Sequence, residues 1–290
     1  MKVLILGGGG TLGAFSAGAL SALEEHRFVP DVMIGSSAGG INLLRHLVGG
    51  PAEATAFWCS VAKLGTILRG LVHGRNFAEG LLDAASFRAR VERGVDFEAM
   101  MKDRRNLAFL VVDLKSGKVS VRGNRTERDA DALRAVSRGA YALPPLLPPV
   151  TLDDEVLADG GLLHNAPLRA AVKLGATEIV YLCNVHAIPH QNFVKQSAIR
   201  SSWRYAEIFF RRASNVGFID AEIVGGRYRG VPLLAIAPPA NLAFGSLFRW
   251  MLPSIDAARY LVDSGYACAT NALATWNPHA AKPPVAASWR

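Results

Sequence analysis

A Gly-x-Ser-x-Gly pentapeptide, Gly35 to Gly39, directly follows a short apolar run at residues 32–34. The run predicts a buried strand and residues 38–44 predict the start of a helix, so Ser37 falls on a sharp turn between them. Glycine at both ends of the pentapeptide leaves no side chain to crowd such a turn. A hydroxyl held there can serve as a nucleophile, although serine is also favoured as an N-cap residue.

A glycine-rich loop lies upstream of this motif. Residues 2–6 predict a strand, residues 11–23 predict an alanine-rich helix, and the string Gly7 to Gly10 joins them. The backbone N–H groups of such a loop form an anion site. In acyl transfer, N–H groups of this kind would stabilise the negative charge that develops on the carbonyl oxygen.

The same glycine string leaves a second interpretation open. Residues 8–13 match the G-x-G-x-x-G pattern of dinucleotide-binding folds, which would make the chain an oxidoreductase. That pattern needs an acidic residue at the far end of the second strand to hold the ribose. Asp31 stands at the near end instead, and the serine motif occupies the far end. The arrangement therefore favours the nucleophile over an NAD or FAD site.

A third motif, Asp159-Gly160-Gly161, follows the apolar run at residues 156–158. The order predicts an aspartate on a tight turn at the end of a strand. Asp-Gly is among the commonest turn dipeptides, so this motif alone also fits a purely structural turn.

Taken together, the three motifs resemble those of the patatin-like phospholipases, a family of lipid acyl hydrolases with a Ser-Asp dyad. The glycine loop, the serine motif and the Asp-Gly-Gly motif occur here in the family's order. The resemblance implies that Ser37 is the nucleophile of lipid ester hydrolysis and that Asp159 is its base. It implies an acyl-enzyme intermediate and no metal or organic cofactor. It also implies an oxyanion hole at Gly8, Gly9 and Gly10.

The similarity extends over most of residues 1–275 and includes the proline-rich stretch 142–150 before the aspartate. One position departs from the family pattern, because Leu12 stands where the family commonly has Arg or Lys. The departure removes a cation from the loop but leaves the backbone donors in place. It therefore bears on phospholipid as the substrate more than on ester hydrolysis.

Two other readings of the serine motif remain open. In the order serine, acid, histidine, His186 and His190 could complete a conventional triad, which would make the chain a Ser-His-Asp esterase. The chain could also be a catalytically silent, lipid-binding member of the fold. Ser37 is reactive in a dyad hydrolase and in a Ser-His-Asp esterase, and it is unreactive in a silent lipid-binding protein.

The apolar runs along the chain predict its fold class. They alternate with helical stretches, which predicts an α/β protein with three α/β/α layers around a largely parallel sheet. A hairpin turn is expected at residues 115–118. We expect one hydrolase domain over residues 1–275 and a loosely held tail over residues 276–290. The predicted strands are residues 3–6, 32–34, 107–112, 119–121, 179–183 and 233–237.

Composition limits the partners. The chain has 32 Lys and Arg against 24 Asp and Glu, a formal net charge of +8 that favours anionic surfaces, but no nucleic-acid motif accompanies it. Residues 197–213 predict a helix with an aromatic face and arginines off that face, which fits either a bilayer surface or core packing. The glycines after residue 6 argue against a signal peptide. We therefore expect a cytoplasmic protein, acting on a lipid ester with peripheral association with an anionic membrane.

Overall fold

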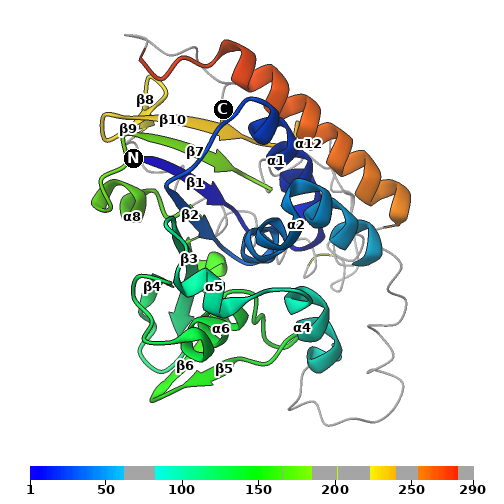
Figure 1. Cartoon of the computed structure of the whole chain (residues 1–290), viewed down its shortest axis with the longest axis vertical. Helices are drawn as coiled ribbons and strands as arrows, with labels where there is room; N and C mark the ends of the chain where they lie inside the picture. The colour runs from blue at the N-terminus through cyan, green and yellow to red at the C-terminus, as the bar shows by residue number, and fades with distance from the viewer. Residues whose placement is uncertain (62–81, 165, 185–200, 202–222, 240–253, 280–290) are drawn as a thin grey trace.

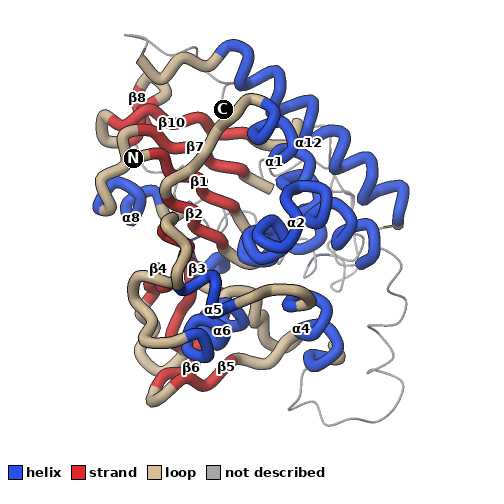
Figure 2. Tube along the Cα trace, viewed as in Figure 1, coloured by secondary structure: helices blue, strands red, loops and turns tan. Residues whose placement is uncertain are grey.

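The computed structural model describes residues 1–61, 82–164, 166–184, 201, 223–239 and 254–279 (Figure 1). Strands gather in one sheet with helices beside it (Figure 2). The strands are β1 (Lys2–Leu6), β2 (Val32–Gly35), β3 (Asn106–Asp113), β4 (Val119–Gly123), β5 (Val150–Leu152), β6 (Glu155–Asp159), β7 (Glu178–Leu182), β8 (Ile223–Val224), β9 (Arg227–Tyr228) and β10 (Val231–Ile236). The helices are the 3₁₀ turn η1 (Gly10–Leu12), α1 (Gly13–Glu25), α2 (Ala38–Val61), α4 (Ala84–Glu92), α5 (Phe97–Met101), α6 (Ala130–Gly139), α7 (Gly161–His164), α8 (Leu168–Lys173) and α12 (Ile255–Thr275).

Five strands form the parallel centre of the sheet, in the order β3-β2-β1-β7-β10. Antiparallel strands flank this centre: β4 and β6 pair with β3, β5 with β6, β9 with β10, and β8 with β9. The predicted α/β fold with a largely parallel central sheet is therefore confirmed, and so is the hairpin between β3 and β4. The sequence does not predict β5, β8 or β9, because each has only two or three residues.

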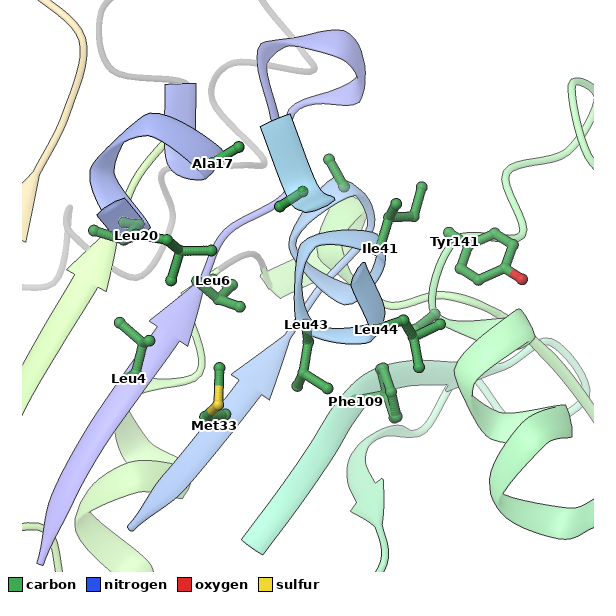
Figure 3. Packing of buried hydrophobic residues seen from close by; sticks show 14 of the residues in the cluster. Leu4, Leu6, Ala17, Leu20, Met33, Ile41, Leu43, Leu44, Phe109 and Tyr141 are labelled. Atoms are coloured by element: carbon green, nitrogen blue, oxygen red, sulfur yellow. The ribbon is translucent and has the colours of Figure 1, made fainter. Parts of the chain in front are cut away.

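Both faces of the central strands β1, β2, β3 and β7 are buried. Alternate residues of a strand point to opposite faces. Leu4, Leu6 and Met33 pack into the cluster that contains α1 and α2 (Figure 3). Val3 and Ile5 belong to the cluster on the other face, which contains α8. Because neither face meets water, the central strands are continuous apolar runs in the sequence.

Helix α12 lies alongside α1 (Figure 1). A Cβ on Gly18 of α1 would lie 1.9 Å from the Val262 oxygen, and a Cβ on Gly265 of α12 would lie 1.9 Å from the Phe15 oxygen. Any side chain at either position would push the two backbones apart. The paired glycines therefore set the close approach of the two helices.

Some sequence predictions fall outside the described residues. They concern His186, His190, the stretch 197–213 except Ser201, and the tail from residue 280. Helix α12 ends at Thr275, and the limits of the hydrolase domain stay a prediction. In the ranges that the structure describes, we find no helix with both the length and the apolar character needed to cross a bilayer.

Candidate active site

Strands β2 and β6 approach each other along one edge of β3. Strand β4 pairs with residues 108–112 of β3 and fills one edge there. Strand β2 pairs with residues 106–109 and β6 with residues 111–113, and each overlaps the span of β4. A strand has two edges, so β2 and β6 both lie on the edge opposite β4. Because β2 is parallel to β3 and β6 is antiparallel, they run head to head.

This head-to-head arrangement places the serine motif beside the aspartate. Gly35, the last residue of β2, pairs with Phe109, and Asp159, the last residue of β6, pairs with Val111. Two residues of an extended strand span about 7 Å. Ser37 lies two residues after Gly35, so the turn that carries Ser37 lies next to Asp159.

Ser37 occupies the turn between β2 and α2. Its φ is 51°, a left-handed conformation that residues other than glycine rarely adopt. Its N–H donates to the Ala140 carbonyl at 2.8 Å, and its own carbonyl accepts from Gly40 N–H at 2.9 Å. Ser37 is partly exposed, whereas its neighbours on both sides, residues 32–36 and 38–40, are buried. The strained turn thus leaves the Ser37 side chain partly exposed while the residues around it are buried.

The glycines of the pentapeptide are required by close contacts. A Cβ on Gly39 would lie 1.9 Å from the Leu6 oxygen, and a Cβ on Gly35 would lie 2.6 Å from the Gly40 Cα. Ser36 N–H also donates to the same Leu6 oxygen at 3.0 Å. The turn after β2 is therefore packed directly against the end of β1.

Asp159 is 3% exposed, and burial raises the pKa of its carboxyl to about 7. Two hydrogen bonds oppose this effect and lower the pKa in part. One joins the carboxyl to the Ser37 side chain, and the other comes from Gly161 N–H at 2.8 Å. A carboxyl with a pKa near neutrality, hydrogen-bonded to a serine, has the basicity that proton transfer at neutral pH requires.

One short segment holds both motifs. The Ala140 carbonyl accepts from Ser37 N–H at 2.8 Å, and the Ala142 carbonyl accepts from Asp159 N–H at 2.8 Å. Both alanines are buried directly after α6. Two carbonyls of one chain segment thus fix the serine and the aspartate relative to each other, which the sequence gives no sign of.

The glycine loop lies beside the serine turn, because Leu6 and Gly35 are paired residues of β1 and β2. Gly9 has φ 158° and Gly10 has φ 56°. These backbone angles make η1, so α1 begins at Gly13 and not at residue 11 as the sequence predicts. The N–H groups of Gly9 and Gly10 find no acceptor among the described residues.

Leu12 is 5% exposed and belongs to the hydrophobic cluster under α1 and α2. A leucine therefore fits the position by packing, and no cation enters the loop from residue 12. Leu12 therefore adds no charge to the loop.

Two buried asparagines hold the ends of the glycine loop. Asn184 Nδ2 donates to the Gly7 carbonyl at 2.7 Å, and Asn42 Nδ2 donates to the Gly13 carbonyl at 2.9 Å. Both side chains are fully buried. The sequence analysis missed both residues. For Asn184 the available signal was a single amide after the carboxyl end of an apolar strand. For Asn42 it was a single amide in the apolar first turns of a helix.

The structure thus brings Ser37, Asp159 and the glycine loop to one place, while their catalytic roles stay predictions. Of the histidines, His164 lies in α7, and the triad candidates lie outside the described residues. The described ranges contain no group of three His, Cys, Asp or Glu side chains that could hold a metal ion.

Comparison with known proteins adds the family. The sequence profile of the patatin-like phospholipases matches residues 4–172. The chain is 26% identical over 189 residues to lysophospholipase NTE1 of Meyerozyma guilliermondii. The matched region covers 61% of this chain and 12% of that protein. It is 32% identical over 185 residues to an uncharacterized NTE family protein of Mycobacterium tuberculosis, which covers 60% of this chain and 49% of that protein. The crystal structure of VipD from Legionella pneumophila aligns with a TM-score of 0.48 and 12% identity, over 94% of this chain and 66% of that chain.

The chain matches at most about half the length of these two sequence relatives. The family profile, in contrast, covers more than half of this chain and contains the glycine loop, Ser37 and Asp159. The chain therefore belongs to the patatin-like phospholipase family.

Proposed function

We propose that the chain is a serine lipid acyl hydrolase that uses a Ser37-Asp159 dyad. The observation that carries the proposal is the pairing of a partly exposed serine, held at φ 51°, with a buried aspartate of pKa about 7 that is hydrogen-bonded to it. An ordinary aspartate, with a pKa near 3.9, would be a weak base at neutral pH. Burial of Asp159 removes that difficulty.

In the proposed reaction, the Ser37 oxygen forms a bond to the ester carbonyl carbon while its proton passes to Asp159. The carbonyl oxygen becomes an oxyanion, stabilised by N–H groups of Gly8, Gly9 and Gly10. When the ester bond breaks, the proton on Asp159 passes to the departing alcohol. Water then attacks the acyl-enzyme, Asp159 accepts its proton, and the carboxylic acid leaves as Ser37 regains a proton.

The substrate class follows from the family. A lipid ester, either a phospholipid or another acyl lipid, is the proposed substrate, and the similarity to a lysophospholipase supports this class. The net charge of +8 supports peripheral association with an anionic membrane from the cytoplasm. The competing proposal is a silent lipid-binding protein, which requires an unreactive Ser37.

The first test is the intact mass of the protein after exposure to a fluorophosphonate, followed by peptide mapping. We expect a single adduct on Ser37 and none in Ser37→Ala. Ser36→Ala is the matched control, because Ser36 is buried and its hydroxyl has no partner among the described residues. An unlabelled but folded protein would overturn the hydrolase and favour the silent binder.

Hydrolysis of a generic ester tests the base. Asp159→Asn should lower kcat by about 10⁴-fold or more, the scale of losing a member of a catalytic unit. Asp153→Asn, an exposed aspartate paired with Arg128, should leave kcat unchanged. The wild-type rate should rise with pH through about 7, because Asp159 accepts a proton only when ionised. A rate already at its maximum at pH 5 would contradict Asp159 as the base.

A further inference from the structure

Gly7, the first residue of the glycine loop, is tied on both sides. Its N–H donates to the Leu182 carbonyl at 2.9 Å, and its carbonyl accepts from Asn184 Nδ2 at 2.7 Å. The Asn184 Oδ1 in turn accepts from the Ser16 hydroxyl of α1 at 2.7 Å. Asn184 and Ser16 are both fully buried, so this chain of bonds has no competition from water.

The hydrogen-bond partners fix which way the Asn184 amide faces. A backbone carbonyl can only accept, so the NH₂ group must be the one that meets Gly7. The amide oxygen is then left toward Ser16, whose hydroxyl can donate to it. The orientation of Asn184 is therefore dictated by chemistry at both ends.

Holding the Gly7 carbonyl also orients the next N–H group. In a planar trans peptide, the carbonyl of one residue and the N–H of the next point in opposite directions. Asn184 binds the carbonyl face of the peptide between Gly7 and Gly8. It therefore fixes the direction of Gly8 N–H, one of the proposed oxyanion donors.

The loop needs such an anchor because its first four residues, Gly7 to Gly10, have no side chains. Glycine populates left- and right-handed conformations about equally, so a free string of glycines would sample many donor directions. At the far end, the Gly13 carbonyl accepts from Asn42 Nδ2, and the Asn42 Oδ1 accepts from Trp58 Nε1 at 2.6 Å. Two buried amides thus bracket the loop, and Asn184 is the one that acts on a donor peptide.

We propose that Asn184 is a positioning residue of the active site, which aligns Gly8 N–H through the Gly7 carbonyl and is itself oriented by Ser16. The inference rests on the proposed acyl-transfer function and deepens it. Asn184 does not touch the substrate. Its contribution lies in the stability of the oxyanion, so it acts on the transition state more than on substrate binding.

The test compares kcat and KM for a generic ester, and the rate of fluorophosphonate labelling, in Asn184→Ala and the wild type. We expect kcat and the labelling rate to fall about ten- to a hundredfold, below the 10²- to 10³-fold that loss of a donor itself costs, with KM within about twofold. Ser16→Ala should cause a smaller loss of the same kind. A rise in KM with kcat unchanged would mean that Asn184 affects only substrate binding, and it would overturn the positioning role.

Asn124→Ala is the matched control for stability. Asn124 is a buried asparagine that donates to the Met100 and Arg105 carbonyls at 3.1 and 3.0 Å and accepts from Leu107 N–H, at the opposite end of β3. It should lower the melting temperature without changing kcat per folded molecule. If Asn184→Ala lowers kcat only as far as Asn124→Ala does at equal loss of stability, the role is structural and the proposal fails.

Asn184→Asp gives a readout that a structural role would not move. A protonated carboxyl can donate to the Gly7 carbonyl, whereas an ionised one repels it, and burial raises the pKa of such a carboxyl. The activity of Asn184→Asp relative to wild type should therefore fall as pH rises, and a pH-independent ratio would contradict the proposal. Fluorophosphonate labelling of Ser37 separates the proposed function from the positioning role. Absence of labelling in the wild type refutes the proposed function. Labelling at equal rates in the wild type and Asn184→Ala refutes only the positioning role of Asn184.

Discussion

The serine and the aspartate come from two regions that are built in different ways. Ser37 sits in the parallel half of the fold, where β2, the glycine turn that holds Ser37, and α2 follow one another directly in the sequence. Asp159 arrives on β6, an antiparallel strand that meets β2 head to head along β3. The proposed nucleophile is thus positioned by its sequence neighbours, whereas the proposed base is positioned by strands distant in the sequence.

The difference extends to charge. Two aspartates at the ends of paired strands, Asp113 of β3 and Asp159 of β6, have opposite environments. Asp113 accepts hydrogen bonds from the Ser116 hydroxyl and from Val156 N–H, and these bonds lower its pKa to about 2. Asp159 is buried with fewer donors, and its pKa is raised to about 7. Hydrogen bonds make one carboxylate a structural anchor, and desolvation makes the other a candidate base.

The largest expected effect tests the local character of the serine region. Gly39→Ala should destabilise the protein by about 3 kcal/mol or more and abolish activity, because its Cβ would lie 1.9 Å from the Leu6 oxygen. Gly40→Ala is the control, since its Cβ would lie 3.4 Å from the Phe109 ring. It should stay within about 1 kcal/mol of wild type. Equal effects of the two substitutions, measured by chemical denaturation, would show that the close contact of Gly39 with Leu6 does not limit the turn.

The second prediction concerns the stability cost of the proposed base. The folded-state pKa of Asp159 is raised, so the protein is destabilised as pH rises from the unfolded value near 3.9 through about 7. Asp159→Asn removes the charge and should therefore stabilise the protein by about 3 to 4 kcal/mol at pH 8 and by less at pH 5. Melting curves at the two pH values check this, and a variant less stable than wild type at pH 8 would contradict it.

A smaller effect is expected at Asp113, the last residue of β3. The pKa of Asp113 is lowered, so its stabilising contribution is present above pH 4 and is lost as pH falls toward 2. Asp113→Asn should lower the melting temperature at neutral pH, and the difference from wild type should vanish near pH 2. A difference that persists at pH 2 would mean that Asp113 acts through packing.

The sequence predicted the parts of this site that depend on local order. The strands, the serine turn and the glycine loop each follow from residues within one short window, and the pairing of Ser37 with Asp159 came from the order of motifs in a family. What could not be foreseen depends on register between distant strands: the head-to-head approach of β6, the Ala140 and Ala142 carbonyls that hold both motifs, and the burial that raises the pKa of Asp159.

The buried asparagines were missed for a related reason. Asn42 and Asn184 lie in separate parts of the sequence, and each is an isolated amide among apolar residues. Only the fold reveals that both bind carbonyls of one loop. A single polar residue next to an apolar strand is a weak signal until its partner is known.

The glycine contact between α1 and α12 also has a consequence for synthesis of the protein. Gly18 and Gly265 pair helices that stand far apart in the chain, and α1 begins where the glycine loop ends. At about 5–20 residues per second, a ribosome makes α1 roughly twelve to forty-six seconds before it makes α12. During that interval the helix behind the loop lacks its partner. A nascent chain would therefore carry Ser37 through most of translation before α1 packs against α12, so the proposed site would be completed late.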